Sequence, residues 1–297
     1  MARSLAAFVL LLLPLAPAHA GQPAKYARPD LLIEAKELAK PEVRERFRIL
    51  DTRSQAKYDA GRVYSASRVD EKAWAKSFGA GPVQQEWEQQ LGGYGLDLNQ
   101  PVVVYGDDLR ETARVWWILR YWGLRDVRIL NGGWLAYKAA GGKTGDASDN
   151  KTPFFPPTNP KLKPRPEVLA TMGQLLDDLK EKRFAILDVR SEGEFCGDTK
   201  LAKRGGAIPN AKHLEWSDVL EGTKQRFKGA EELRKLFKDA GVDLARPAVT
   251  YCQSGGRASV MAFALELMGA KAVSNYYRSW SEWGNATDTP IVTPKKK

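Results

Sequence analysis

The residues best suited to chemistry are a cysteine, two glycines and an arginine in the segment Cys252-Gln253-Ser254-Gly255-Gly256-Arg257. Two adjacent glycines allow the backbone to turn so that successive N–H groups point inward and bind a negative charge. A cysteine beside an arginine in such a turn ionises more readily than a free cysteine, and the thiolate is the reactive form. We therefore interpret Cys252 as a nucleophile.

A strand must precede this segment and a helix must follow it. Residues 247–251 begin with proline and continue with β-branched and aromatic residues, which is typical of a strand. After the loop, apolar residues recur at helical spacing at Val260, Phe263, Ala264 and Leu267, and Gly269 marks the expected helix end. The nucleophile should therefore lie at the carboxyl end of a strand, where open α/β sheets bind ligands, and next to the positive end of a helix dipole.

Arg257 stands at a position that is unfavourable for a cation. A cation in the first turn of a helix is disfavoured by the helix dipole, at a cost of about 0.3–1 kcal/mol. A bound anion would offset this cost, so the arginine favours an anion-binding loop. The alternative is that Cys252 is a buried structural cysteine, but an apolar burial site would need neither the glycines nor the arginine.

Residues 1–20 have the three parts of a secretory signal peptide. Arg3 precedes an apolar run from Leu5 to Leu15, and Ala18-His19-Ala20 supplies a small-residue cleavage site before Gly21. The run is shorter than a membrane span, although an uncleaved anchor is the alternative. We expect an exported protein, periplasmic or secreted, with no membrane association.

The chain has two cysteines, and export raises the question of whether they pair. A structural disulfide would silence the loop, so we disfavour it, while an oxidised resting state stays open. Cys196 has no basic neighbour in the sequence and is expected to be a small buried hydrophobe. His213 is the single histidine of the mature chain, and packing is its expected role, with a pairing to Cys252 as the alternative. With so few ligands, neither a metal nor a cofactor is expected.

The basic charge points to small anions and not to nucleic acid. The formal charge is +10, and removal of Arg3 with the signal peptide leaves +9. The lysines and arginines are scattered and form no basic stripe interleaved with aromatic residues, so no nucleic-acid partner is expected. The sequence indicates no particular oligomeric state.

One unit is present twice. Residues 46–54 return in similar form as residues 183–191, and 102–105 return as 248–251. The proline-rich stretch 152–166 between the copies cannot be a helix or an inner strand. We therefore predict a first domain over 21–148, a linker over 149–166 and a second domain over 167–297.

The first copy lacks the nucleophile. Gly106, followed by Asp107 and Asp108, stands where the second copy has Cys252. Two carboxylates repel anions, so this domain should be chemically silent and form one wall of the cleft.

Strand-like and helix-like segments alternate in both copies, which predicts an α/β fold with parallel sheets covered by helices on both faces. The predicted strands include Val102–Tyr105, Val127–Leu130, Ala185–Val189, Val249–Tyr251 and Ala272–Ser274; the predicted helices include Ser54–Ala60, Thr112–Trp122, Met172–Lys182 and Glu231–Ala240.

With these features in place, the chain resembles the tandem-domain rhodaneses, the thiosulfate and 3-mercaptopyruvate sulfurtransferases. The resemblance covers essentially the whole mature chain. It rests on the Cys252–Arg257 loop, the Leu-Asp-x-Arg strand ends at 50–53 and 187–190, residues 206–211, and the closing segment 279–283. Asn210, where the family usually has glycine, and Tyr277-Arg278, where it has an acidic residue and glycine, are peripheral departures.

The resemblance implies two tandem rhodanese-like domains and sulfur transfer through a persulfide on Cys252. The donor would be thiosulfate or 3-mercaptopyruvate, and the acceptor cyanide or a thiol. It also implies the residues that bind the donor, namely Gln253, Ser254, Gly255, Gly256 and Arg257 of the loop and Arg190 from the neighbouring strand end. For Arg190, a salt bridge to Asp188 or Glu194 is the alternative role.

Three other functions stay open. The loop combines a serine typical of mercaptopyruvate enzymes with the basic Arg257 typical of thiosulfate enzymes, and we favour thiosulfate. A phosphatase loop of related fold places its arginine six residues after the cysteine, whereas here the spacing is five. A persulfide carrier that does not turn over would need the same loop.

Overall fold

Two parallel β-sheets, one in each half of the chain, organise the computed structural model, which describes residues 25–149, 155–222 and 225–296. The predicted signal peptide lies outside the described residues. The first sheet has the order β1-β6-β5-β2-β4 and the second has the order β11-β10-β8-β9. Their strands are β1 (Leu32–Glu34), β2 (Arg48–Asp51), β4 (Ala66–Arg68), β5 (Val102–Tyr105), β6 (Val127–Asn131), β8 (Ala185–Asp188), β9 (Lys212–His213), β10 (Ala248–Tyr251) and β11 (Val273–Asn275).

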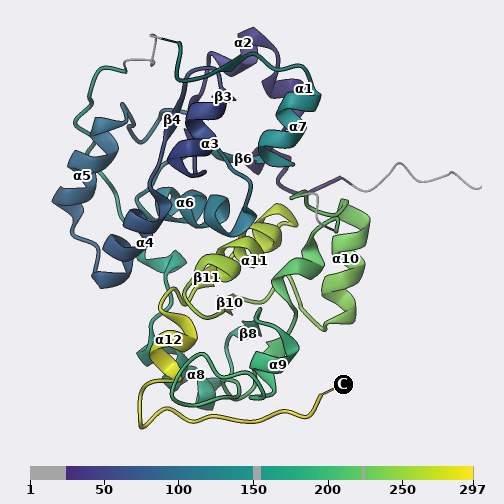
Figure 1. Cartoon of the computed structure of the whole chain (residues 1–297). Helices are drawn as coiled ribbons and strands as arrows, with labels where there is room; N and C mark the ends of the chain where they lie inside the picture. The colour runs from purple at the N-terminus through teal and green to yellow at the C-terminus, as the bar shows by residue number, and fades with distance from the viewer. Residues whose placement is uncertain (1–24, 150–154, 223–224, 297) are drawn as a thin grey trace, which may run out of the picture.

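Helices flank both sheets, as Figure 1 shows. The first half contains α1 (Ala35–Leu38), α2 (Pro41–Arg44), α3 (Gln55–Ala60), α4 (Glu71–Ala80), α5 (Gln84–Gly93), α6 (Leu109–Tyr121) and α7 (Gly133–Ala139), with a small antiparallel pair of β3 (Arg62–Val63) and β7 (Thr144–Gly145). The second half contains α8 (Met172–Glu181), α9 (Glu192–Phe195), α10 (Ala230–Asp239), α11 (Gly256–Leu267) and α12 (Ser279–Trp283). The α/β fold predicted from the sequence is confirmed.

The central strands β5, β8 and β10 are buried at every residue, as expected of parallel strands that are covered on both faces. In β5, Val102 and Val104 belong to one apolar cluster, while Val103 and Tyr105 belong to another on the opposite face. The second sheet repeats the pattern, with Leu187 on one face and Ile186 on the other.

The register of the two sheets reproduces the duplication seen in the sequence. Asp51 of β2 lies opposite Tyr105 of β5, and Asp188 of β8 lies opposite Tyr251 of β10. In each pair the tyrosine hydroxyl donates a hydrogen bond to the aspartate, at 2.5 Å in the first sheet and 2.6 Å in the second. The same polar pair therefore ends the central strands of both domains.

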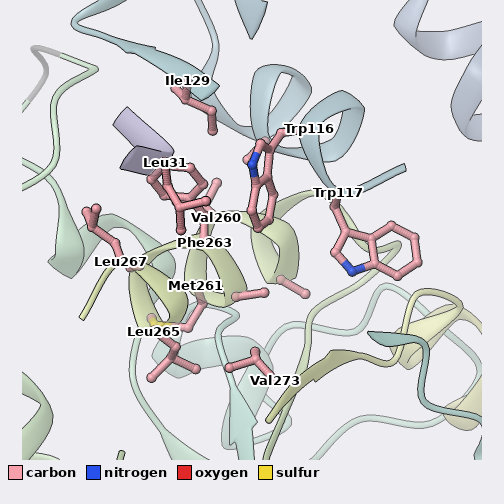
Figure 2. Packing of buried hydrophobic residues seen from close by; sticks show 14 of the residues in the cluster. Leu31, Trp116, Trp117, Ile129, Val260, Met261, Phe263, Leu265, Leu267 and Val273 are labelled. Carbon is pink, nitrogen blue, oxygen red and sulfur yellow. The ribbon is translucent and has the colours of Figure 1, made fainter. Parts of the chain in front are cut away.

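The two domains share one apolar core, formed where α6 of the first packs against α11 of the second. Figure 2 shows Trp116 of α6 directed toward α11, where Val260 and Phe263 lie. Trp116 meets Phe263 edge to face at a centroid distance of 4.8 Å, and Trp117 stacks on Tyr277 at 5.2 Å. Because α11 is buried on almost every side and packs on α6, the second domain is built directly on the first.

The predicted elements deviate from the observed ones mainly at their ends. The helix expected to begin at Thr112 begins at Leu109, because the Asp108 side chain accepts a hydrogen bond from the Arg110 N–H and caps the helix. Residues 155–165 of the proline-rich stretch contain neither helix nor strand. In the described parts of the chain, no helix has the length and apolarity needed to cross a membrane.

Candidate active site

Cys252 follows the last residue of β10 and lies in the turn that leads into α11. Its side chain is buried, with the residue only 2% exposed. The N–H of Gly255 donates a hydrogen bond to its Sγ at 3.1 Å. Because a helix leaves its first N–H groups without intrahelical acceptors, the start of α11 adds further donors on this side. The turn therefore directs positive dipoles at the sulfur.

The segment after β11 holds the back of this loop. The Cys252 N–H donates to the Ser279 hydroxyl at 3.0 Å, and the Cys252 carbonyl accepts from the Trp280 N–H at 2.9 Å. Ser279 adopts a left-handed backbone with φ +53°, which is uncommon for a residue other than glycine. In the sequence this segment carries only the family resemblance, and no pattern in it assigns Ser279 to the site.

The two loop glycines are needed for different physical reasons. Gly255 has φ +88°, and a Cβ there would lie 2.8 Å from the Tyr277 ring. Gly256 has no left-handed backbone, but a Cβ there would lie 2.6 Å from a guanidinium nitrogen of Arg114. The second glycine therefore makes room for a side chain of the other domain.

Arg257 has a carboxylate partner that the sequence did not reveal. Its guanidinium donates two hydrogen bonds to Glu194 of α9, at 2.6 and 2.8 Å. Burial lowers the pKa of Arg257, but the hydrogen bonds to Glu194 and the nearby Cys252 outweigh burial and raise it. The dipole penalty expected at this position is thus offset by a protein carboxylate. Ser191 and Glu194 form a capping box, the one sequence signal that could have marked this glutamate.

Arg190 is not among the residues that line the pocket at the Cys252 loop, so the structure gives its predicted role in donor binding no support. The residue is 1% exposed, and its guanidinium binds Asp188 at 2.5 Å and the Gly206 carbonyl at 2.6 Å. It also lies over the Trp280 ring at 4.2 Å. The salt bridge considered as the alternative is the one observed.

The first domain repeats this arrangement without a nucleophile. Arg53 binds Asp51 at 2.6 Å and the Gly61 carbonyl at 2.7 Å, and it lies over Trp134. Since both domains contain this network, it serves the fold and not the reaction.

Residues of both domains line a pocket of about 500 Å³ at the loop. The first domain contributes Glu71, Lys72, Asp108, Arg110, Glu111 and Arg114, and the second contributes Leu201, Cys252, Gln253, Ser254, Gly256 and Arg257. Arg110 binds Asp108 at 2.5 Å and Arg114 binds Glu71 at 2.7 Å. Lys72 forms no salt bridge with a described residue. The pocket therefore presents cations whose charge is largely balanced by carboxylates.

The corresponding turn of the first domain has no room for a cysteine. A Cβ at Gly106 would lie 2.2 Å from the Thr52 hydroxyl oxygen and 2.9 Å from that of Thr112. The turn is also shorter, with residues 106–108 between strand and helix where the second domain has 252–255. A side chain at residue 106 would therefore have to displace the Thr52 and Thr112 hydroxyl groups.

The remaining candidate residues lie outside the pocket lining. His213 packs on Phe195 at 4.8 Å, and its Nε2 lies 2.8 Å from the Arg190 carbonyl oxygen. Both cysteines are free, and Cys196 is half-buried, not fully buried as expected. Desolvation, followed by the charges of Glu192 and Asp198, raises the pKa of the Cys196 thiol and disfavours its thiolate. Within the described residues, no cluster of histidine, cysteine and acidic side chains suits a metal ion.

Comparisons with known proteins agree with this geometry. Residues 34–140 and 171–286 each match the family model described as the rhodanese-like domain. A thiosulfate sulfurtransferase of Corynebacterium glutamicum is 30% identical over 289 residues, which cover 91% of this chain and 92% of that protein. The thiosulfate sulfurtransferase of Mus musculus is 33% identical over 219 residues, covering 68% of this chain and 69% of its own. The sulfur carrier protein TtuD of Thermus thermophilus is 30% identical over 292 residues, covering 90% of this chain and 98% of the carrier.

Solved structures share the fold at lower identity. The anaerobic ergothioneine biosynthesis enzyme of Chlorobium limicola, in complex with trimethyl histidine, superimposes with a TM-score of 0.82 at 22% identity. The match covers 94% of this chain and 74% of that enzyme. YnjE superimposes with a TM-score of 0.76 at 22% identity, and the match covers 92% of this chain and 70% of the YnjE chain.

The Glu194–Arg257 pair predicts a pH-dependent stability difference. Burial raises the pKa of Glu194, but Arg257 outweighs burial and holds it below its ordinary value. A carboxyl group of lowered pKa stabilises the fold above its unfolded pKa of about 4.3, and this contribution is lost as the pH falls through the folded value. Glu194→Gln should therefore lower the free energy of unfolding by about 3 kcal/mol near neutral pH and by progressively less in acid.

Thermal unfolding of both proteins across this range measures the difference. If Glu194→Gln lost the same amount of stability at neutral and at acidic pH, the charge of Glu194 would not be what stabilises the loop.

Proposed function

The chain belongs to the rhodanese family of sulfurtransferases, and from this premise we propose that it transfers the outer sulfur of thiosulfate through a persulfide on Cys252. The family membership expected from the loop and the repeated strand ends is thereby confirmed. The observation that carries the proposal is the hydrogen bond from the Gly255 N–H to the Cys252 sulfur, inside a pocket reached from solvent. A donor N–H at this point stabilises a negative sulfur both before and after it receives another sulfur.

The reaction has two steps. The Cys252 thiolate attacks the outer sulfur of thiosulfate, a new S–S bond forms on the enzyme, and the S–S bond of the donor breaks with its electron pair leaving on sulfite. Cyanide or a thiolate then attacks the outer sulfur of the persulfide, and the Cys252 thiolate is regenerated. Covalent catalysis of this kind divides one difficult transfer into two easier ones.

The loop backbone and Arg257 supply the groups that would bind the donor. Gln253, Ser254, Gly255 and Gly256 present the N–H groups, and Arg257 stands in the first turn of α11. Because Glu194 balances the charge of Arg257, the guanidinium acts mainly as a fixed hydrogen-bond donor and less as a free charge. A small anion fits such a site better than a large one.

3-Mercaptopyruvate is the second candidate donor, and Ser254 is the observation that favours it. The loop serine resembles mercaptopyruvate enzymes, whereas Arg257 resembles thiosulfate enzymes. Initial rates with each donor at equal concentration separate the two.

A persulfide carrier is the second candidate function, and the similarity to the Thermus sulfur carrier protein favours it. A carrier would release one sulfite per chain and then stop with free cyanide present. An enzyme would release many.

Cys252→Ser should abolish persulfide formation, because the proposal makes this thiolate the only nucleophile. Incubation with thiosulfate followed by intact-mass measurement should show one added sulfur on the wild type and none on the variant. Cys196→Ser is the matched control and should still gain the sulfur, since the pKa of that thiol is raised. A variant lacking Cys252 that still gained sulfur would refute the assignment.

Arg257→Ala should raise the KM for thiosulfate by about 10- to 100-fold, the value of one lost hydrogen bond to a charged group. Steady-state sulfite release as a function of donor concentration gives this constant. Glu194→Gln serves as the control, because it disturbs the same ion pair but keeps the guanidinium. An unchanged KM in Arg257→Ala would move donor binding to the backbone alone.

We also propose that the protein is exported to the periplasm or secreted. The support is the basic, apolar and small-residue pattern of residues 1–20. Amino-terminal sequencing of protein produced in a Gram-negative host should find Gly21 as the first residue of the periplasmic form. Retention of residues 1–20 in a membrane fraction would indicate an uncleaved anchor.

A further inference from the structure

We propose that Arg114 of the first domain is a positioning residue for the cysteine loop of the second domain. The domain without a nucleophile would then determine which way the key N–H of the site points. This inference rests on the proposed function of Cys252 as the sulfur-bearing nucleophile.

Arg114 bridges the two domains through its two terminal nitrogens. One donates to the Glu71 carboxylate at 2.7 Å, and the other donates to the Ser254 carbonyl oxygen at 3.1 Å. Glu71 is 6% exposed and opens α4. The arginine is thus anchored within the first domain while it binds the loop of the second.

The carbonyl that Arg114 binds belongs to the same peptide unit as the N–H that faces the sulfur. In a trans peptide the C=O of Ser254 and the N–H of Gly255 point in opposite directions. Arg114 holds the carbonyl on one side, so the N–H is directed to Cys252 Sγ on the other. A cationic donor on the carbonyl also polarises the peptide and strengthens its N–H as a donor.

The sequence of the loop makes such external support necessary. Gly255 has φ +88°, and glycine tolerates positive and negative φ about equally, so the preceding peptide is free to rotate. A rotated peptide would place the Ser254 carbonyl oxygen near the sulfur and remove the N–H. Among the described residues, Arg114 is the only side chain found to donate to this carbonyl.

The close approach of Gly256 to Arg114 is a second, independent observation. A Cβ at residue 256 would lie 2.6 Å from the bridging nitrogen and 3.2 Å from the guanidinium carbon. A side chain at residue 256 would therefore have to displace the end of the Arg114 side chain. The Tyr277 ring, 6.0 Å from the guanidinium, covers another side of it.

Arg120 is the matched control within the same helix. It also crosses from α6 to the second domain, where it binds Glu266 at 2.5 Å, but it does not line the pocket. Replacing either arginine by methionine keeps the aliphatic volume and removes one bridge between the domains. Loss of interface stability is thus common to both variants, and only Arg114→Met should alter the loop.

The experiment compares the full chain carrying Arg114→Met or Arg120→Met, each in the Cys196→Ser background. Alkylation of Cys252 by iodoacetamide near neutral pH and the ultraviolet absorbance of its thiolate report the loop without any sulfur donor. We expect Arg114→Met to slow alkylation about tenfold and to lower the thiolate absorbance, which corresponds to one weakened hydrogen bond. Arg120→Met should lower the melting temperature and leave both signals at their wild-type values.

A double-mutant cycle tests the steric part. Gly256→Ala should slow alkylation in the wild type, because the added methyl group displaces the guanidinium. In the Arg114→Ala background the same change should have little further effect. Wild-type alkylation and absorbance in Arg114→Met, or additive effects in the cycle, would overturn the inference. A failure of the proposed function would give a different result, because the wild-type chain would then gain no sulfur from thiosulfate.

Discussion

The hydrogen bond from the Gly255 N–H to the Cys252 sulfur is the contact around which the candidate site is built. It requires a left-handed glycine, a helix that begins at the next residue, and a strand that ends just before the cysteine. Each of these is satisfied by the arrangement of β10 and α11, and the segment after β11 fixes the loop from behind. A backbone donor is preorganised at no cost during the reaction, which makes it better suited than a mobile side chain to stabilise a negative sulfur.

The charged side chains around the loop are paired, and this pairing changes how the site works. Arg257, Arg114 and Arg110 each bind a carboxylate, so the pocket does not rely on a cluster of free cations. Paired arginines keep fixed positions and spare donors, whereas free ones would be mobile and strongly hydrated. The Gly255 N–H and the Arg257 guanidinium both place positive charge near the sulfur.

Duplication provided one domain for chemistry and another for support. Both retain the buried aspartate, arginine and tyrosine network at the ends of their central strands, because an unpaired buried charge would be costly in either copy. Only the longer turn of the second domain has room for a thiol. The first domain has kept its helix α6, whose apolar face forms the shared core and whose Arg114 reaches the loop. The first domain thus contributes residues to the pocket lining beside the cysteine loop.

The sequence by itself indicated the candidate nucleophile and predicted the duplication and the alternation of strands and helices, because each depends on residues close together in the chain or on a direct repeat. It also showed that Gly106 of the first copy stands at the position equivalent to Cys252 of the second. Only the tertiary structure decided which charges meet. Arg190 binds Asp188, and Arg257 binds Glu194 of α9. Arg114 of the first domain binds the Ser254 carbonyl oxygen of the second. The contacts of Arg257 and Arg114 join residues far apart in the chain, and their geometry follows from the packing of the sheets and of α6 on α11, which no local pattern of residues encodes. Arg190 and Asp188 are only two residues apart, so the sequence could offer their salt bridge as an alternative, but only the structure shows that it forms.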